Sequence, residues 1–253
     1  MGENQEEMQT GRHEALVLIS APVRNREKHL PRYLESIHQL DYPKRLLSFY
    51  FLVNDCFDNT LNILHQFKKD HEKDYRHIVI DEINLNAPLD ARTSIRGQVI
   101  YKNLTFLRNK ILDYFLTTDN EYLFSIDSDI MVFSNCLKKL LKTDKDLISA
   151  EIANDFGRGF IGNTLKFISD SKHPDNGQYV HLKLPDMPEI YGVDLTGAVF
   201  LAKRVVIESG AKYSNHSFGE DLPFCEAVKK NGFKMFSMKG LAIHDMQKLE
   251  GEK

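Results

Sequence analysis

The 253-residue sequence predicts an α/β fold whose mostly parallel central sheet carries helices on both faces. Short apolar runs alternate with segments of helical periodicity in the order strand, helix, strand, helix, strand, which is typical of parallel sheets. Polar and acidic residues follow these runs directly, as they do where ligands bind at the carboxyl ends of such strands. The composition, 42% hydrophobic and 27% charged, is that of a globular chain able to bury a sizeable core.

The first half of the predicted domain, residues 15–135, alternates regularly. Short apolar runs predict buried strands, and the first of them is closed by Pro22. Between the runs, apolar side chains recur every three or four residues, as Leu30, Leu34 and Ile37 do on one helical face. The expected elements are, in order, strand 15–22, helix 27–40, strand 46–53, a helix from about residue 60, strand 77–80, an irregular stretch over 82–96, helix 98–117 and strand 122–126.

The second half, residues 136–253, is less regular and predicts a smaller region that completes the same domain. Residues 154–189 are rich in Gly, Asn, Asp and Pro and show little periodicity, so we expect a long loop there, of a length that is usually functional or mobile. Residues 1–14 are polar and acidic and predict a flexible lead, which leaves one domain over 15–253. The remaining expected elements are helix 134–142, strand 146–153, strand 197–202, helix 220–231 and two short segments at 233–238 and 241–244.

Charge and cysteine usage narrow the function classes. The net charge is −3, so the chain has no basic excess to neutralise phosphates along a nucleic acid, and we expect no nucleic-acid partner. An anionic nucleotide would need local basic residues or a bound cation. The three cysteines form no CxxC pair, which argues against a disulfide framework or a zinc ribbon. Neither a signal peptide nor a transmembrane stretch is evident, so the sequence predicts a cytoplasmic protein.

The strongest local motif is Asp127-Ser128-Asp129, directly after the apolar run that ends at Ile126. In an extended segment, side chains two residues apart point to the same side, so the two carboxylates would lie together. Two like charges held together are costly unless a cation compensates them, and Mg²⁺ or Mn²⁺ prefers such oxygen ligands. The alternative is a strand-end turn with two solvated aspartates.

Asp55 and Asp58 follow the second predicted strand in the same way. A carboxylate there could accept hydrogen bonds from a nucleobase or ribose. Alternatively, Asp58 caps the helix that begins near Thr60, since aspartate is a preferred N-cap. Arg108 lies on the helix before the Asp127 strand and could pair with a phosphate or carboxylate, although a solvated helix face is the commoner role of an arginine.

Two further candidates lie near the C-terminus. Glu220 and Asp221 open a predicted helix, where the helix dipole alone would stabilise them. A carboxylate at the edge of a pocket could instead act as a general base toward a hydroxyl. His244 follows an apolar stretch and is either an imidazole ligand of a metal or a structural histidine.

These residues, in this order, resemble the GT-A (Rossmann-like) glycosyltransferases, particularly the inverting family 2 and its relatives. The likeness covers roughly residues 15–245 and is strongest over 15–135. It is also seen in collagen galactosyltransferase domains and, more loosely, in fungal Golgi mannosyltransferases. The matching segments are the opening Ala21–Arg26, the loop Val53–Thr60, the helix segment Leu107–Lys110 and the strand with its motif, Glu121–Asp129. The chain departs from the family at Cys56, Phe57 and Asn59 and in having no tryptophan at all.

The resemblance implies a role for each candidate. Residues 15–135 would bind a nucleotide sugar and 136–253 the acceptor. Asp129 and His244 would hold the metal, while Asp127 would contact the metal or the ribose and sugar. The remaining implied roles are donor or nucleoside contact for Asp55, Asp58 and Arg108, an acceptor-side wall at Gly197, and acceptor base for Asp221 with Glu220 as its substitute.

The implied activity is a metal-dependent glycosyltransferase that moves a sugar from a UDP- or GDP-linked nucleoside-diphosphate sugar to an acceptor hydroxyl. A single displacement with inversion is expected, with Mn²⁺ or Mg²⁺ as cofactor. The acceptor, whether a glycan, a lipid-linked molecule or a protein, is not specified by the sequence. Two alternatives stay open: a catalytically inactive GT-A-like binding module, and a metal-dependent phosphohydrolase.

Overall fold

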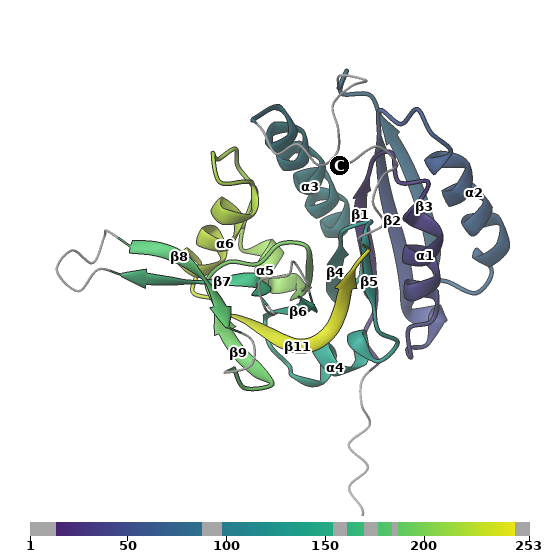
Figure 1. Cartoon of the computed structure of the whole chain (residues 1–253). Coiled ribbons are helices and arrows are strands. Elements are labelled where there is room, and N and C mark those ends of the chain that lie inside the picture. Colours follow the sequence, from purple (N-terminus) through teal and green to yellow (C-terminus); the bar gives the residue numbers. More distant parts are fainter. Residues whose placement is uncertain (1–13, 88–97, 154–160, 170–176, 184–186, 246–253) are drawn as a thin grey trace, which may run out of the picture.

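The computed structural model describes residues 14–87, 98–153, 161–169, 177–183 and 187–245. A nine-stranded sheet runs through them in the order β3-β2-β1-β4-β10-β6-β11-β5, with β9 paired to β11 beside this path (Figure 1). A separate two-stranded sheet is formed by β7 and β8. The prediction of an α/β fold with helices on both faces of a central sheet is confirmed.

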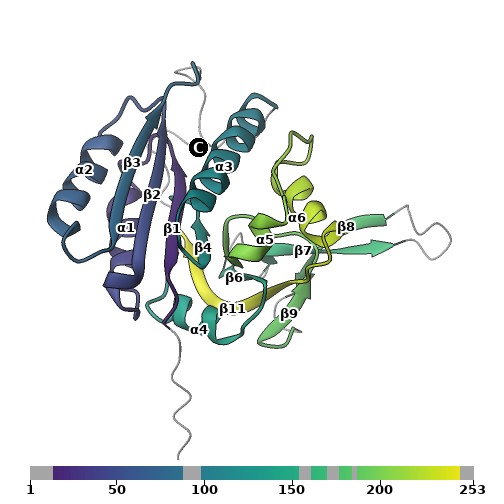
Figure 2. The same cartoon turned by 180° about the vertical axis from the view of Figure 1, so that it is seen from behind.

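The first half of the sheet is parallel, as the alternation of strands and helices predicts. Its strands are β1 (Val17–Val23), β2 (Leu47–Asn54), β3 (His77–Ile83) and β4 (Tyr122–Ile126). Side chains of β1 alternate between the two faces, with Val17 and Ile19 in one hydrophobic core and Leu18 in the other. Helices α1 (Leu30–His38) and α2 (Thr60–His71) cover the first face, and α3 (Gln98–Thr117) covers the second (Figures 1 and 2).

The second half of the sheet is mixed. Strand β10 (Val199–Lys203) lies antiparallel between β4 and β6 (Leu147–Ala153), and β6 pairs in parallel with β11 (Met235–His244). Strands β5 (Ile130–Val132) and β9 (Ile190–Val193) pair antiparallel with β11. Helices α4 (Cys136–Lys142), α5 (Arg204–Glu208) and α6 (Asp221–Lys230) complete this half, with the short 3-10 helix η1 (Lys44–Leu46) before β2.

The prediction of an irregular loop over residues 154–189 is wrong for the part of this segment that the structure describes. Residues Ile161–Ser169 form β7 and residues Gly177–Lys183 form β8, and the two strands pair as an antiparallel hairpin that extends away from the central sheet (Figures 1 and 2). The sequence segments 233–238 and 241–244 are one strand, β11, whose register with β6 shifts between Met238 and Ala242. Gly240 lies in that interval with φ +66, a conformation that glycine adopts without steric cost.

Two other predictions fall partly or wholly outside the described residues: the flexible lead at 1–14 and most of the stretch 82–96. In the part of the chain that the structure describes, no helix combines the length and the apolar character needed to cross a bilayer.

Candidate active site at the carboxyl ends of the parallel strands

The motif after β4 forms a tight turn rather than the extended segment expected from alternation. The Asp127 backbone N–H donates to the Ala198 carbonyl at 2.8 Å, and the Ile130 N–H donates back to the Asp127 carbonyl at 2.9 Å. The Ser128 hydroxyl, which is buried, donates to the Pro22 carbonyl at 3.3 Å. These bonds fix the turn to β1 and to the segment before β10. Asp127 and Asp129 therefore project from a rigid support, each toward a different arginine.

Arg108 on α3 joins the end of β4 to the start of α6. Its Nη2 donates to both carboxylate oxygens of Asp127, at 2.9 and 3.2 Å, and its Nε donates to Glu220 at 3.0 Å. The side chain is only 5% exposed. Burial opposes its charge, but the nearby carboxylates outweigh burial and raise the pKa of Arg108 well above its usual value. Its Nη1 is buried without a hydrogen-bond partner among the described residues. The guanidinium is thus a fixed cation with an unused donor.

The same network perturbs Asp127. Burial raises its pKa, the ion pair with Arg108 opposes the rise, and the nearby Asp129 and Glu220 charges add to it, with a net pKa of about 6. A carboxyl that is costly to ionise and lies beside a fixed cation is typical of functional sites.

Glu220 and Asp221 differ sharply in environment although they are adjacent. Glu220 is buried and committed to Arg108, whereas the Asp221 side chain is 33% exposed and lies 3.9 Å from Arg108 Nε. Asp221 rests against Gly197: a Cβ built at residue 197 would lie 2.1 Å from Asp221 Oδ2. Gly197 therefore leaves the space that the Asp221 carboxylate occupies. Of the two acids, Asp221 is the more exposed.

Asp129 and His244 meet at the far side of the turn. The Asp129 Oδ2 lies 3.8 Å from His244 Nε2, and the Asp129 carbonyl accepts the Asp245 N–H at 2.9 Å. His244 Nδ1 is buried with no hydrogen-bond partner among the described residues. Asp245, also buried, lies 2.7 Å from Arg32 and 3.3 Å from His29, so the end of β11 is tied to the start of α1.

The residues present fit a divalent cation that is completed by a ligand. The described part of the chain holds no group of three or more His, Cys, Asp and Glu side chains arranged for a metal ion. Asp129 and His244 nevertheless offer one oxygen and one nitrogen within 3.8 Å of each other. Mg²⁺ in phosphate sites commonly uses one or two protein carboxylates together with phosphate oxygens and water, so a pair of ligands suffices there. Asp127, the third predicted ligand, is turned to Arg108.

Asp55 and Asp58 hold two loops in shape. The Asp55 carboxylate accepts the Leu85 N–H at 3.1 Å, and Asp58 accepts the N–H groups of Thr60 at 3.0 Å and Glu27 at 3.1 Å. The Thr60 bond is the local contact expected of a residue that opens α2. The Glu27 bond joins the loop after β1 to the loop after β2. The structure thus brings Arg108, Asp127, Glu220, Asp221 and Gly197 into one network and Asp129 and His244 into a second, with Asp55 and Asp58 in flanking loops.

Two residues of this site were not singled out from the sequence. Arg26 donates to Asp129 at 3.0 Å, and Tyr213 lies under Arg108, with its ring centre 5.7 Å from the guanidinium carbon. Arg26 stands in the loop between the first predicted strand and helix, where doubly wound folds bind diphosphates. That position is the signal that could have identified it. Tyr213 lies in an irregular segment and carries no local signal.

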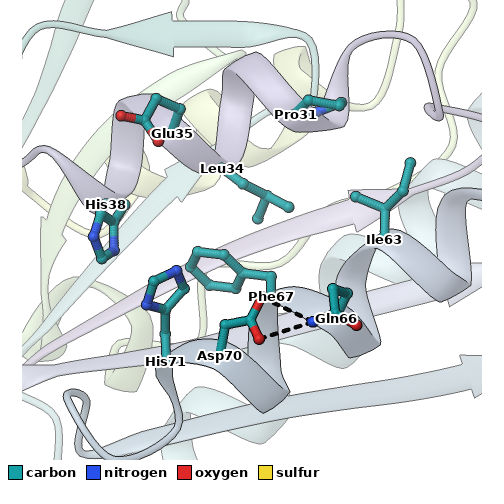
Figure 3. A pocket seen from close by; sticks show the side chains of 9 residues that line it. All are labelled: Pro31, Leu34, Glu35, His38, Ile63, Gln66, Phe67, Asp70 and His71. Atoms are coloured by element: carbon teal, nitrogen blue, oxygen red, sulfur yellow. Dashed lines mark hydrogen bonds between the residues drawn. The ribbon is translucent and has the colours of Figure 1, made fainter.

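A cavity of about 260 Å³ lies away from these residues, between α1 and α2 (Figure 3). Two histidines, His38 and His71, face each other at one end of it with ring centres 4.2 Å apart. Lys44 donates to His38 Nε2 at 2.9 Å, and Tyr75 lies 2.9 Å from Nδ1, so both ring nitrogens of His38 are engaged. None of the nine lining residues is a predicted site residue. The cavity therefore does not belong to the site at the strand ends.

Sequence comparisons match the first part of the chain. A family model described as Anp1 matches residues 1–161. The mannan polymerase II complex anp1 subunit of Schizosaccharomyces pombe is 28% identical over 144 residues, covering 52% of this chain and 34% of that protein. A glycosyltransferase 25 family member of Drosophila pseudoobscura pseudoobscura is 26% identical over 136 residues, covering 52% of this chain and 22% of that protein. The chain therefore spans about a third or less of the length of these curated relatives.

Solved structures match nearly the whole chain at low identity. GalNAc-T7 with UDP, GalNAc and Mn²⁺ matches with a TM-score of 0.64 and 13% identity, covering 96% of this chain and 46% of that one. The mannosyltransferase PcManGT from Pyrobaculum calidifontis, in complex with GDP-Man and Mn²⁺, matches with a TM-score of 0.60 and 13% identity, covering 94% and 59%. At such identities the likeness concerns the fold, which is the GT-A fold that the resemblance of the sequence implies.

Proposed function

This chain belongs to the Anp1 family, and on that premise we propose that it is a metal-dependent glycosyltransferase. It would move a sugar from a nucleoside diphosphate to an acceptor hydroxyl, with inversion at the anomeric carbon. One observation carries the proposal: at the sheet edge where strands β1, β2 and β4 end, Arg108 pairs with Asp127 at 2.9 Å and lies 3.9 Å from Asp221.

The donor would be UDP- or GDP-linked and would lie over the ends of β1, β2 and β4. The ligands held by the two structural neighbours support this donor class. Asp55 and Asp58 shape the loops that would flank the nucleoside. Asp127 would accept hydrogen bonds from ribose or sugar hydroxyls, and the unpaired Nη1 of Arg108 would donate to the donor.

Asp129 and His244 would hold Mn²⁺ or Mg²⁺. When bound, such a cation acts as a Lewis acid that neutralises charge on a departing diphosphate. This chain carries a net charge of only −3, so a bound cation would also help it to attract an anionic donor.

Asp221 would take the proton from the acceptor hydroxyl as that oxygen attacks the anomeric carbon. Its exposure and the room left by Gly197 support this assignment, and the burial of Glu220 against Arg108 makes Glu220 the less suitable base. One displacement with a base on the acceptor side inverts the configuration, which is why we propose inversion. The acceptor class stays open.

A panel of nucleotide sugars with and without Mn²⁺, read first by thermal shift and then by product mass spectrometry, tests the proposal. We expect stabilisation by one UDP- or GDP-sugar that depends on Mn²⁺, followed by sugar transfer to a glycoside in an acceptor panel. Stabilisation without any transfer would favour the inactive binding module. Release of free nucleotide at a rate independent of acceptor would favour the phosphohydrolase. Binding of no nucleotide would refute the assignment.

A further inference from the structure

The positively charged side chain of Arg26 contacts Asp129, the candidate metal ligand, on the oxygen that a metal ion would also use. Its Nη2 donates to Asp129 Oδ2 at 3.0 Å, and that same oxygen faces His244 Nε2 at 3.8 Å. Both side chains are mostly shielded, with Arg26 18% and Asp129 20% exposed. An ion shared by Asp129 and His244 through this oxygen would therefore compete with the guanidinium of Arg26 for the same negative charge.

The backbone of Arg26 is fixed, so only its side chain is free to change partner. The Arg26 N–H donates to Thr60 Oγ1 at 2.6 Å, and the Arg26 carbonyl accepts the N–H groups of His29 and Leu30 at 2.9 and 2.8 Å. These bonds anchor residue 26 immediately before α1. The guanidinium uses Nη2 on Asp129, while its Nε is buried with no hydrogen-bond partner among the described residues. Four of the five N–H groups of the guanidinium therefore make no hydrogen bond to Asp129.

A bound diphosphate would offer Arg26 a second anionic partner. Residue 26 lies in the loop between β1 and α1, and in doubly wound folds a diphosphate lies at that first loop and the start of its helix. The planar guanidinium matches phosphate oxygens in a bidentate fashion. The anion expected under the proposed function would therefore meet Arg26 close to its present position.

We infer that Arg26 exchanges Asp129 for the donor diphosphate, and that this exchange makes the divalent cation and the nucleotide bind cooperatively. The inference rests on the proposed function. A cation that binds alone must displace Arg26 and leave its guanidinium without an anion. A nucleotide that binds alone meets an arginine already neutralised by Asp129. Bound together, the cation takes Asp129 and the diphosphate takes Arg26, so every charge keeps a partner. Because coupling between two ligands is reciprocal, each raises the affinity of the other by the same factor.

Mn²⁺ titrations followed by electron paramagnetic resonance, with and without saturating UDP or GDP, test this inference without any measurement of activity. For the wild-type chain we expect the nucleotide to tighten Mn²⁺ binding by about tenfold or more, within the usual range of allosteric coupling. Arg26→Gln should bind Mn²⁺ alone more tightly than wild type. Its coupling factor should fall several-fold below the wild-type value, to the part that direct contact between the ion and the diphosphate oxygens supplies. Arg26→Lys keeps the positive charge but cannot bind phosphate in a bidentate fashion. It should bind Mn²⁺ alone as weakly as the wild-type chain does.

Arg45→Gln is the control. It removes one positive charge from an exposed side chain that pairs with Glu14 rather than with a residue near Asp129. It should leave the coupling factor at the wild-type value. Thermal unfolding of each variant confirms that it is folded before titration. An unchanged Mn²⁺ affinity and coupling factor in folded Arg26→Gln would overturn the role of Arg26 alone. A wild-type chain that binds neither Mn²⁺ nor nucleotide would overturn the proposed function and this inference together.

Discussion

Replacing Gly197 by alanine tests the role of Asp221 without touching its carboxylate. A Cβ at residue 197 would lie 2.1 Å from Asp221 Oδ2 and 2.3 Å from its Cγ, whereas an ordinary contact begins at 3.4 Å. The Asp221 side chain must therefore withdraw by roughly 1 Å or more to restore van der Waals separation. Since this side chain is 33% exposed, it has room to turn toward solvent, and we expect the fold to be retained.

The expected loss follows from that displacement. A misplacement of about 1 Å in a catalytic arrangement costs on the order of 10²-fold in rate, which corresponds to about 2.7 kcal/mol of activation free energy. We therefore expect Gly197→Ala to lower kcat for sugar transfer about 10²-fold, while the Kd for nucleotide with Mn²⁺ stays within about twofold. The assay is steady-state transfer with the donor found in the thermal-shift panel, and calorimetry supplies the Kd.

Two comparisons make this result specific. Gly192→Ala is the matched control, because a Cβ there meets nothing closer than the Met235 carbonyl at 4.0 Å, and it should transfer sugar at the wild-type rate. In the double variant Gly197→Ala/Asp221→Asn, the two losses should not add, because both act through one carboxylate. Fully additive losses, or a Gly197→Ala variant as fast as wild type, would refute the placement of Asp221 as the base.

Three further predictions concern metal binding, stability and pH. Asp129→Asn should abolish Mn²⁺-dependent stabilisation by the nucleotide, and a wild-type response to Mn²⁺ in thermal shift would contradict the ligand assignment. Arg108→Met leaves Glu220 buried without its cation, so urea unfolding should show that the free energy of unfolding falls by about 3–5 kcal/mol. A fall of less than about 1 kcal/mol would show that the Arg108–Glu220 pair does not stabilise the fold. Burial, Lys44 and His71 lower the pKa of His38, so the folded chain binds fewer protons at His38 than the unfolded chain does. The stability that this histidine contributes is therefore present above about pH 6.5 and is lost as the pH falls below it. His38→Gln should flatten the decline of Tm between about pH 7 and pH 5.5, and equal slopes for both proteins would contradict this prediction.

The parallel half of the sheet was predictable because its signals are local. Apolar runs and helical periodicity over residues 15–126 specify strands β1 to β4 and helices α1 to α3 without reference to the rest of the chain. The β7–β8 hairpin lacked such a signal, because its strands carry polar and exposed residues such as Ile168. Part of its pairing is also distant in sequence, as between Leu165 and Leu195. The insertion of β10 between β4 and β6 is likewise a matter of long-range pairing that no local pattern reveals.

The candidate site was predictable as a set of residue types but not as a set of partners. Asp127, Asp129 and Asp221 were each singled out by position beside a strand or at a helix end, and Arg108 by its place on the helix before the Asp127 strand. Their pairing could not be derived, because Arg108 and Glu220 are 112 residues apart and Arg26 and Asp129 are 103 residues apart. The extended conformation assumed for 127–129 was also wrong, because the Ile130 N–H donates to the Asp127 carbonyl and closes a turn there.

The proposed function depends on a cation held by Asp129 and His244 beside a nucleoside diphosphate. A crystal of the wild-type chain grown with Mn²⁺ and UDP or GDP, measured at the manganese absorption edge, locates that ion directly. We predict one anomalous peak within bonding distance of Asp129 and His244 and of the diphosphate oxygens, with the guanidinium of Arg26 moved onto the phosphate. A bound nucleotide with no manganese at these two side chains would contradict the account.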